Sequence, residues 1–123
     1  MHKIGRSCFK IEAKGDKSAE IMIYGDIGES WYGDSVEATE FVKSLNQVDA
    51  EVITARVNSY GGSVSDGLAI YNALRRHPAT VNIEIDGIAA SIASLIAMAG
   101  DYVGIAENAR IMVHAPWAGA VGN

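Results

Sequence analysis

A serine, a histidine and a pair of glycines in this chain have the types and the order that acyl transfer requires. Ser91 follows the small-residue stretch Gly87-Ile-Ala-Ala, the adjacent Gly61 and Gly62 close an earlier loop, and His114 ends a β-like run. A serine hydroxyl becomes a useful nucleophile when a base lies beside it, and backbone N–H groups stabilise the oxyanion that its attack creates. Together these features predict acyl transfer to Ser91, with peptide hydrolysis as the first hypothesis.

Each of these residues also has an ordinary structural explanation. Ser91 can cap the helix that it precedes, since serine is a preferred N-cap residue. Two adjacent glycines can belong to a flexible loop or a phosphate-binding loop, and a lone histidine in an apolar strand is more often structural than catalytic. The patterns GxGxxG and GxxxxGK[ST] are absent, which weakens the nucleotide-binding alternative. The functional interpretation therefore depends on all three features occurring together.

The segments around these residues alternate between strand and helix patterns. Runs of β-branched or alternating residues predict strands at 20–24, 52–57, 80–85, 103–105 and 110–114. Apolar residues at helical spacing predict helices at 35–45, 65–76 and 91–100, and residues 87–91 are expected to form a turn. This alternation predicts an α/β fold whose parallel strands are joined by right-handed crossovers.

The expected sheet places the candidate residues on one edge. Loop 58–62, turn 87–91 and His114 each follow a predicted strand. Binding sites in open parallel sheets collect at the carboxyl ends of the strands. Gly62 lacks a Cβ, and Ile92 opens the predicted helix, where backbone N–H groups are free. The N–H groups of these two residues are therefore the candidate oxyanion donors beside Ser91.

Length and composition limit the classes of function. A chain of 123 residues that is 49% hydrophobic predicts one folded domain, at 18–123, preceded by a basic segment at 1–17 that we expect to be solvated. The net charge of −5 argues against nucleic acid as a partner. Cys8 is the only cysteine, which fits a reducing compartment. Because no stretch matches a signal peptide or a membrane span, we expect a cytoplasmic protein with no membrane partner.

Three sequence blocks resemble the proteolytic subunit of the Clp protease family (ClpP), which are serine peptidases. The blocks are NSYGGSVSDGLAIYNAL (58–74), DGIAASIASLIAMAG (86–100) and ARIMVHAPW (109–117), and the resemblance covers residues 20–123. Together with IYGDIG at 23–28, they are most similar to phage and prophage members associated with head maturation. The resemblance implies a ClpP/crotonase-like spiral of β-α-β units with a mostly parallel sheet, assembled into rings with the active sites inside.

The resemblance also assigns roles to residues. Ser91 matches the nucleophile of the family, His114 its general base, and Gly62 and Ile92 its oxyanion donors. The neighbouring loop residues that would contact the substrate are Tyr60, Gly61 and Ser63. No metal and no organic cofactor is implied. The implied partners are a polypeptide substrate, further copies of the chain in a ring, and an AAA+ unfoldase or phage capsid and scaffold proteins.

The sequence departs from the family pattern at two places. Tyr60 replaces the proline that is usual in the NSPGG loop. More seriously, the catalytic aspartate of the family follows the histidine after a long helix, and no aspartate follows His114 here. Asp86 and Asp101 are of the right type but occupy other positions. Either the chain is truncated at its C-terminus or the triad is incomplete, and losing the orienting carboxylate costs about 10⁴ in turnover.

Two other functions compete with peptide hydrolysis. The missing aspartate favours a ring-forming structural or assembly module with a vestigial site. The shared crotonase-like fold raises the possibility of acyl-CoA chemistry. A hydratase of that kind would need a glutamate at the catalytic edge, and neither loop 58–62 nor turn 87–91 supplies one.

Overall fold

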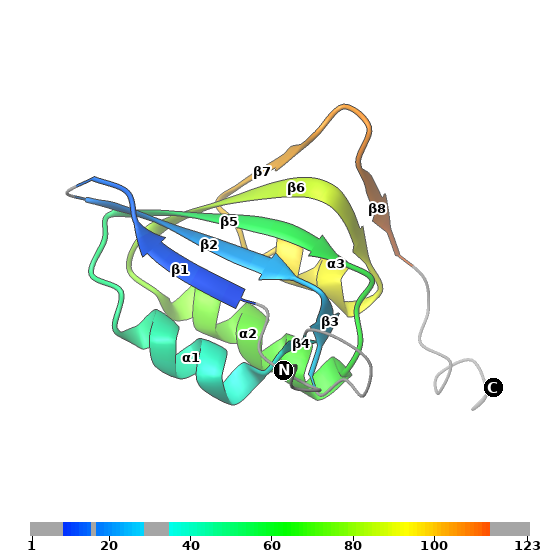
Figure 1. Ribbon diagram of the computed structural model, residues 1–123, viewed down its shortest axis with the longest axis horizontal. Helices are drawn as coiled ribbons and strands as arrows, with labels where there is room; N and C mark the ends of the chain where they lie inside the picture. Colours follow the sequence, from blue (N-terminus) through cyan, green and yellow to red (C-terminus); the bar gives the residue numbers. More distant parts are fainter. Residues whose placement is uncertain (1–8, 16, 29–34, 114–123) are drawn as a thin grey trace, which may run out of the picture.

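The main sheet has six strands, and in Figure 1 the three helices lie on one side of it. The computed structural model describes residues 9–15, 17–28 and 35–113. The elements in chain order are β1 (Phe9–Ala13), β2 (Ser18–Tyr24), β3 (Asp26–Ile27), β4 (Ser35–Val36), α1 (Ala38–Asn46), β5 (Val52–Ser59), α2 (Val64–Arg76), β6 (Thr80–Ala90), α3 (Ile92–Ala97), β7 (Tyr102–Ile105) and β8 (Arg110–Met112).

The strand order is β1-β2-β5-β6-β7, and β8 pairs with the end of β6 beyond β7. The pairs β2–β5, β5–β6, β6–β7 and β6–β8 are parallel, and only the β1–β2 pair of this sheet is antiparallel. Helices α1, α2 and α3 lie in the three connections between successive parallel strands. The predicted α/β fold with a mostly parallel sheet is therefore confirmed.

The core lies between the sheet and the helices. Strands β2, β5 and β6 alternate buried and partly exposed residues, so that one face of each is apolar. The fully buried side chains of these strands include Ile21, Ile53 and Ile83, and α1 contributes Phe41 and Leu45. Among the described residues, no helix covers the opposite face, and that face carries most of the polar side chains of the sheet.

Strand β1 lies within a segment in which the sequence analysis expected no strand. It pairs with β2 from Phe9↔Ile23 to Ala13↔Ala19, and the ring of Phe9 packs edge-on against Phe41 with 5.3 Å between ring centroids. The run FKIEA alternates apolar and charged residues, which is a strand pattern. Because residues 1–17 are rich in basic side chains, the sequence analysis expected a solvated segment and did not recognise this strand pattern.

The boundaries of the helices also differ from the predictions. Residues Ser35–Val36 form β4, so α1 begins at Ala38, and its N-cap Glu37 makes no side-chain capping bond. Helix α2 begins one residue earlier than predicted, because the Ser63 hydroxyl accepts the N–H of Asp66 at 3.2 Å and caps it. Helix α3 ends at Ala97 instead of residue 100. Within the described ranges, no helix has the length and apolar character needed to cross a bilayer.

Candidate active site

Residues 87–90, which were predicted as part of a turn, form a bulge and the end of strand β6, and only Ser91 of the predicted stretch lies in a turn. The β5–β6 ladder pairs Val57 with Ile85 and next pairs Ser59 with Ala89, so three residues of β6 lie opposite Asn58 alone. A Cβ on Gly87 would lie 2.5 Å from Oδ1 of Asn58. Gly87 therefore allows a side chain of β5 to approach the bulge, and the turn prediction was wrong for residues 87–90.

The Asn58 side chain bonds to the backbone of the bulge. Its Oδ1 accepts the N–H of Ile88 at 3.1 Å. On the other edge of β6, β8 follows β7 and pairs through Ile88↔Arg110, Ala89↔Ile111 and Ala90↔Met112. The end of β6 is therefore held by both β5 and β8 immediately before Ser91.

Ser91 has a backbone conformation that serine rarely adopts. Its φ is 56° and its ψ is −127°, and it is the only non-glycine residue with positive φ in the described part of the chain. Such a conformation costs roughly 1–3 kcal/mol and persists only where neighbours impose it. The Ser91 N–H donates to the carbonyl of Met112 at 3.0 Å, and its carbonyl accepts the Ser94 hydroxyl at 2.6 Å. A sharp strand-to-helix turn that holds its serine in this way resembles a nucleophile elbow.

The alternative that Ser91 acts as a helix cap is not supported. Ser91 occupies the N-cap position of α3, but its side chain makes no capping hydrogen bond. The N–H of Ser94 bonds to the Ser91 carbonyl at 3.0 Å and leaves the hydroxyl unused as a cap. The side chain is therefore available for other chemistry.

The loop after β5 packs directly on Ser91. The buried Ser59 hydroxyl accepts the N–H of Gly61 at 3.1 Å and fixes the start of the loop. A Cβ on Gly61, whose φ is +105°, would lie 2.8 Å from both the Ala90 carbonyl oxygen and the Ser91 Cβ. Only glycine fits here, because the backbone conformation and the close approach both exclude a side chain.

The two candidate oxyanion donors flank this contact. Ile27 bonds to the Gly61 carbonyl and to the Ser63 N–H, both at 2.9 Å, in a parallel bridge opposite Gly62. This bridge does not use the N–H of Gly62. The N–H of Ile92 is the first of α3 and has no acceptor within that helix. The Cβ position on Gly61 lies 3.3 Å from this Ile92 nitrogen, so the loop and the helix N-terminus meet.

Helix α2 sets the position of Ile92. A Cβ on Gly67 would lie 2.2 Å from Ile92 Cγ1, so α3 approaches α2 as closely as a glycine permits. Ile92 is buried in this contact. The sequence analysis missed Gly67 and Asn58 as supporting residues. A glycine inside a helical pattern and an asparagine at a strand end were the available signals.

The predicted loop residues Tyr60 and Ser63 differ in their environment. The Tyr60 side chain is 74% exposed and lies one residue from the Gly61–Ser91 contact. The Ser63 hydroxyl caps α2, and the Ser63 N–H bonds to Ile27. Tyr60 is thus open to a ligand, whereas Ser63 helps to shape the loop.

His114 lies outside the described residues, so its predicted role as the base stays a prediction. Strand β8 ends at Met112, two residues earlier in the sequence, and the carbonyl of Met112 is the acceptor of the Ser91 N–H. The segment that leads to His114 therefore reaches the Ser91 backbone.

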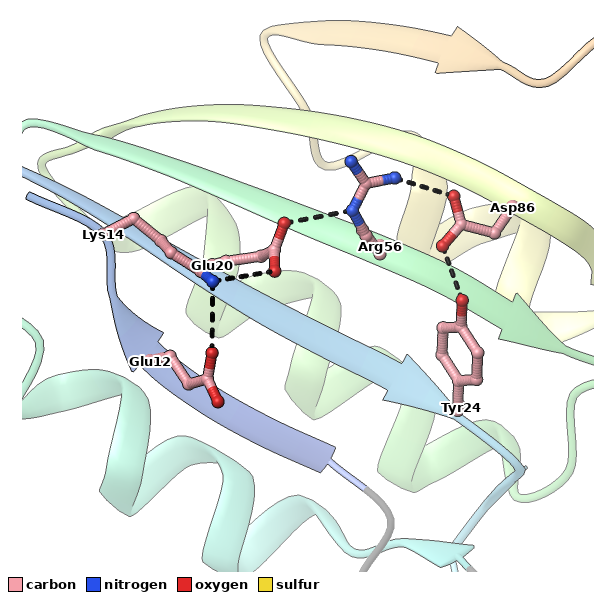
Figure 2. Close-up of polar contacts among 6 residues, drawn as sticks. All are labelled: Glu12, Lys14, Glu20, Tyr24, Arg56 and Asp86. Carbon is pink, nitrogen blue, oxygen red and sulfur yellow. Dashed lines mark hydrogen bonds and ion pairs between the residues drawn. The ribbon is translucent and has the colours of Figure 1, made fainter.

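The two aspartates with the right chemistry have other partners. Asp101 Oδ2 accepts the N–H of Val81 at 2.8 Å, at the start of β6. With about 3.3 Å of rise per residue, Val81 and Ser91 are separated by about 30 Å of strand. Asp86 accepts the Tyr24 hydroxyl at 2.5 Å and Arg56 Nη1 at 2.9 Å on the open face of the sheet (Figure 2). Neither carboxylate is presented to the residues around Ser91.

Comparison with known proteins identifies the family. The profile of the Clp protease family, described as "Clp protease", matches residues 4–123. The chain belongs to the Clp protease family. The ATP-dependent Clp protease proteolytic subunit of Ligilactobacillus salivarius (strain UCC118) is 35% identical over 121 residues, covering 96% of this chain and 60% of that protein. The subunit of the same name from Pleurastrum terricola is 35% identical over 105 residues, covering 83% of this chain and 52% of its own length.

A solved structure supports the same relationship. ClpP1 from Listeria monocytogenes superposes with a TM-score of 0.70 at 28% identity, covering 81% of this chain and 58% of that one. This Clp protease family chain thus spans between half and two thirds of the length of the relatives that it matches.

Proposed function

We propose that this chain is a serine-type endopeptidase that hydrolyses peptide bonds through an acyl-enzyme on Ser91, with His114 as the general base. The observation that carries the proposal is the conformation of Ser91. Its backbone is held at φ 56° against the glycine loop, and its side chain is not used as a cap. Membership of the Clp protease family supports the same chemistry.

In the proposed mechanism, His114 takes the Ser91 proton as the hydroxyl oxygen attacks the scissile carbonyl. The N–H groups of Gly62 and Ile92 then donate to the oxyanion, each worth roughly 3–4 kcal/mol in comparable sites. The tetrahedral intermediate collapses, the leaving amine receives the proton from His114, and the acyl group stays on Ser91. Water, activated by the same base, then hydrolyses the ester.

The third member of the triad and the partners belong to the proposal as well. Asp86 and Asp101 are bonded elsewhere, so we propose that a different carboxylate, from the same chain or from a neighbouring copy, orients His114. We propose a polypeptide substrate, assembly of copies into a ring and a cytoplasmic location. An AAA+ unfoldase, or the capsid and scaffold proteins of a phage head, would be the functional partner.

Covalent labelling of Ser91 tests this proposal directly. A fluorophosphonate forms a stable adduct with an activated serine, because it mimics the acyl transfer step. Intact mass spectrometry of the protein should show one adduct, and peptide mapping should place it on Ser91. Ser91→Ala should remove the adduct, and the control Ser44→Ala, which changes a serine of α1, should retain it.

The engagement of Asp86 and Asp101 with other partners favours a second candidate, an assembly module with a vestigial site. A folded wild-type protein that forms oligomers but takes up no adduct would support this candidate and overturn the peptidase proposal. The variant His114→Ala distinguishes a serine that is activated by a base from one that is only accessible to the reagent. Labelling should slow strongly in this variant if the histidine acts as the base.

A further inference from the structure

Side chains from three strands meet at the start of the β6 bulge. Asp86 is the first residue after the regular β5–β6 ladder ends at Val57↔Ile85. One oxygen of its carboxylate accepts the Tyr24 hydroxyl of β2, and the other accepts Arg56 Nη1 of β5. Figure 2 shows the three side chains extending toward one another across the open face of the sheet. Asp86 is therefore fixed relative to β5, the neighbour of β6 in the sheet, and relative to β2, the next strand beyond β5.

The cluster continues along the face toward β1. Arg56 Nε also bonds to Glu20 at 3.0 Å, and Lys14 lies 4.0 Å from Glu20 and 3.3 Å from Glu12. The hydrogen bonds to Glu20 and Asp86 raise the pKa of Arg56 above its ordinary value. Each carboxylate is matched by a cation or a hydroxyl, so the network is internally satisfied.

The exposure of this network shows that stability is not its main contribution. The side chain of Arg56 is 40% exposed, and those of Glu20 and Asp86 are each 26% exposed. Ion pairs with this much solvent contact contribute about 0–1 kcal/mol each. A geometric role explains the bonds at Asp86 better, because they lie where the regular register between β5 and β6 is interrupted.

We propose that Asp86, acting through Tyr24 and Arg56, is a positioning residue for Ser91. This inference rests on the proposed function. The Asp86 side chain holds the first residue of the bulge, and the Asn58 side chain bonds to the N–H of Ile88, its last residue. Pairing with β5 resumes at Ala89. The direction in which β6 leaves the bulge decides where Ala90 and Ser91 meet Gly61.

The contact of Ala90 and Ser91 with Gly61 tolerates little displacement. The Cβ position on Gly61 is only 2.8 Å from the Ala90 carbonyl oxygen and from the Ser91 Cβ. A shift of about 1 Å in a reacting group can cost about 10²-fold in rate. Loosening the bulge at Asp86 therefore reduces the reactivity of Ser91 while leaving the sheet folded.

The first test is the kinetics of fluorophosphonate inactivation, separated into the affinity for the probe and the rate constant of the covalent step. Asp86→Ala should lower the covalent rate constant about 10-fold with unchanged affinity, since only alignment is lost. Asp86→Asn keeps an oxygen that can accept the Tyr24 hydroxyl and should restore part of the rate. The matched control is Glu20→Gln, which changes the other carboxylate bonded to Arg56, and it should react as the wild type does.

The second test does not require activity. Hydrogen exchange of the amides of Ile88 and Ser91 reports on their bonds to Asn58 and Met112. In Asp86→Ala both amides should exchange faster, while the central amides of β5 keep the wild-type rates. In Glu20→Gln the amides of Ile88 and Ser91 should be unchanged.

The possible results separate the two proposals. A wild-type protein without an adduct contradicts the proposed function, and hydrogen exchange then still decides whether Asp86 orders the bulge. An Asp86→Ala protein with wild-type exchange at Ile88 and Ser91, or with a wild-type covalent rate constant where an adduct forms, overturns the positioning role. A uniform increase in exchange throughout the sheet also overturns it, because Asp86 would then be only a structural residue.

Discussion

At Ser91, contacts with residues distant in the sequence hold a conformation that serine avoids on its own. The bond to Met112 comes from β8, and the close contact with Gly61 comes from the loop after β5. The sequence around Ser91 consists of small residues, which permit this conformation but do not specify it. The motif therefore predicts Ser91 as the candidate nucleophile, whereas its strained backbone appears only when β5, β6 and β8 are in place.

Tyr24 gives a residue-scale prediction about pH. The hydrogen bond to Asp86, followed by burial and the charge of Asp86, raises the pKa of Tyr24 to about 12 from the ordinary value of 10.0. A raised pKa means that the folded state favours the neutral phenol, so the stabilisation is complete below pH 10 and is lost as pH rises to 12. Tyr24→Phe should therefore be less stable than the wild type below pH 10, and the difference should disappear at higher pH.

Urea unfolding of the two proteins as a function of pH checks this prediction. The comparison isolates Tyr24, because the two proteins differ only in this one hydroxyl group. Tyr102→Phe, at a tyrosine that is 69% exposed on β7, is the control and should keep the pH dependence of the wild type. Equal pH dependence in wild type and Tyr24→Phe would contradict the contribution of the Tyr24–Asp86 bond.

At the scale of elements, local sequence patterns correctly predicted those strands and helices that depend mainly on their own residues. Strand β5 and helix α2 lie within two residues of their predicted bounds, because their apolar spacing is regular. The bulge in β6 could not be predicted, because it depends on an Asn58 side chain from another strand. Glycine marks both turns and bulges, so Gly87 alone did not distinguish them.

The candidate site, likewise, could be predicted from the sequence only in part. Sequence spacing placed Gly62 and Ser91 after adjacent strands, and the structure brings their loops into contact. The sequence spacing did not reveal that α2 must approach α3 closely to fix the position of Ile92. That requirement appears only when helix packing is known, since Gly67 lies 25 residues before Ile92.

Gly67→Ala tests how α2 positions the site. Alanine is favoured over glycine in a helix by about 1 kcal/mol. The new Cβ, however, would lie 2.2 Å from Cγ1 and 3.2 Å from Cβ of Ile92, so the whole Ile92 side chain must move. Overpacking of this kind costs about 1–3 kcal/mol, which exceeds the helical gain. We expect a lower free energy of unfolding together with slower labelling of Ser91.

Asn72→Ala is the matched control, since Asn72 is an exposed position of the same helix. It should keep the wild-type labelling rate and be at least as stable, because only the helix propensity changes. Denaturant unfolding and labelling kinetics of both variants provide the measurement. A Gly67→Ala protein that is more stable than wild type and labels normally would show that α3 can shift without consequence for Ser91.

At the scale of the whole molecule, no layer of the described residues covers β7 and β8. Neighbouring residues of β7 are both exposed, Tyr102 at 69% and Val103 at 42%, whereas a half-buried strand would hide every second side chain. The β8 residues Ile111 and Met112 are also exposed, and Figure 1 shows both strands projecting beyond the helices. Contiguous exposed apolar residues of this kind mark interaction surfaces.

We therefore expect this chain to self-associate through β7 and β8, as the ring proposed above requires. Replacing Val103 and Ile105 with lysine should shift the sedimentation coefficient of the protein toward that of the monomer, because burying two charges opposes association. Both side chains are solvated in the isolated chain, so the free energy of unfolding should change little. Met98→Lys, at an apolar residue that is 49% exposed at the end of α3, is the control and should sediment as the wild type does. If the double variant keeps the wild-type assembly, copies associate through another surface, and the expectation for β7 and β8 is wrong.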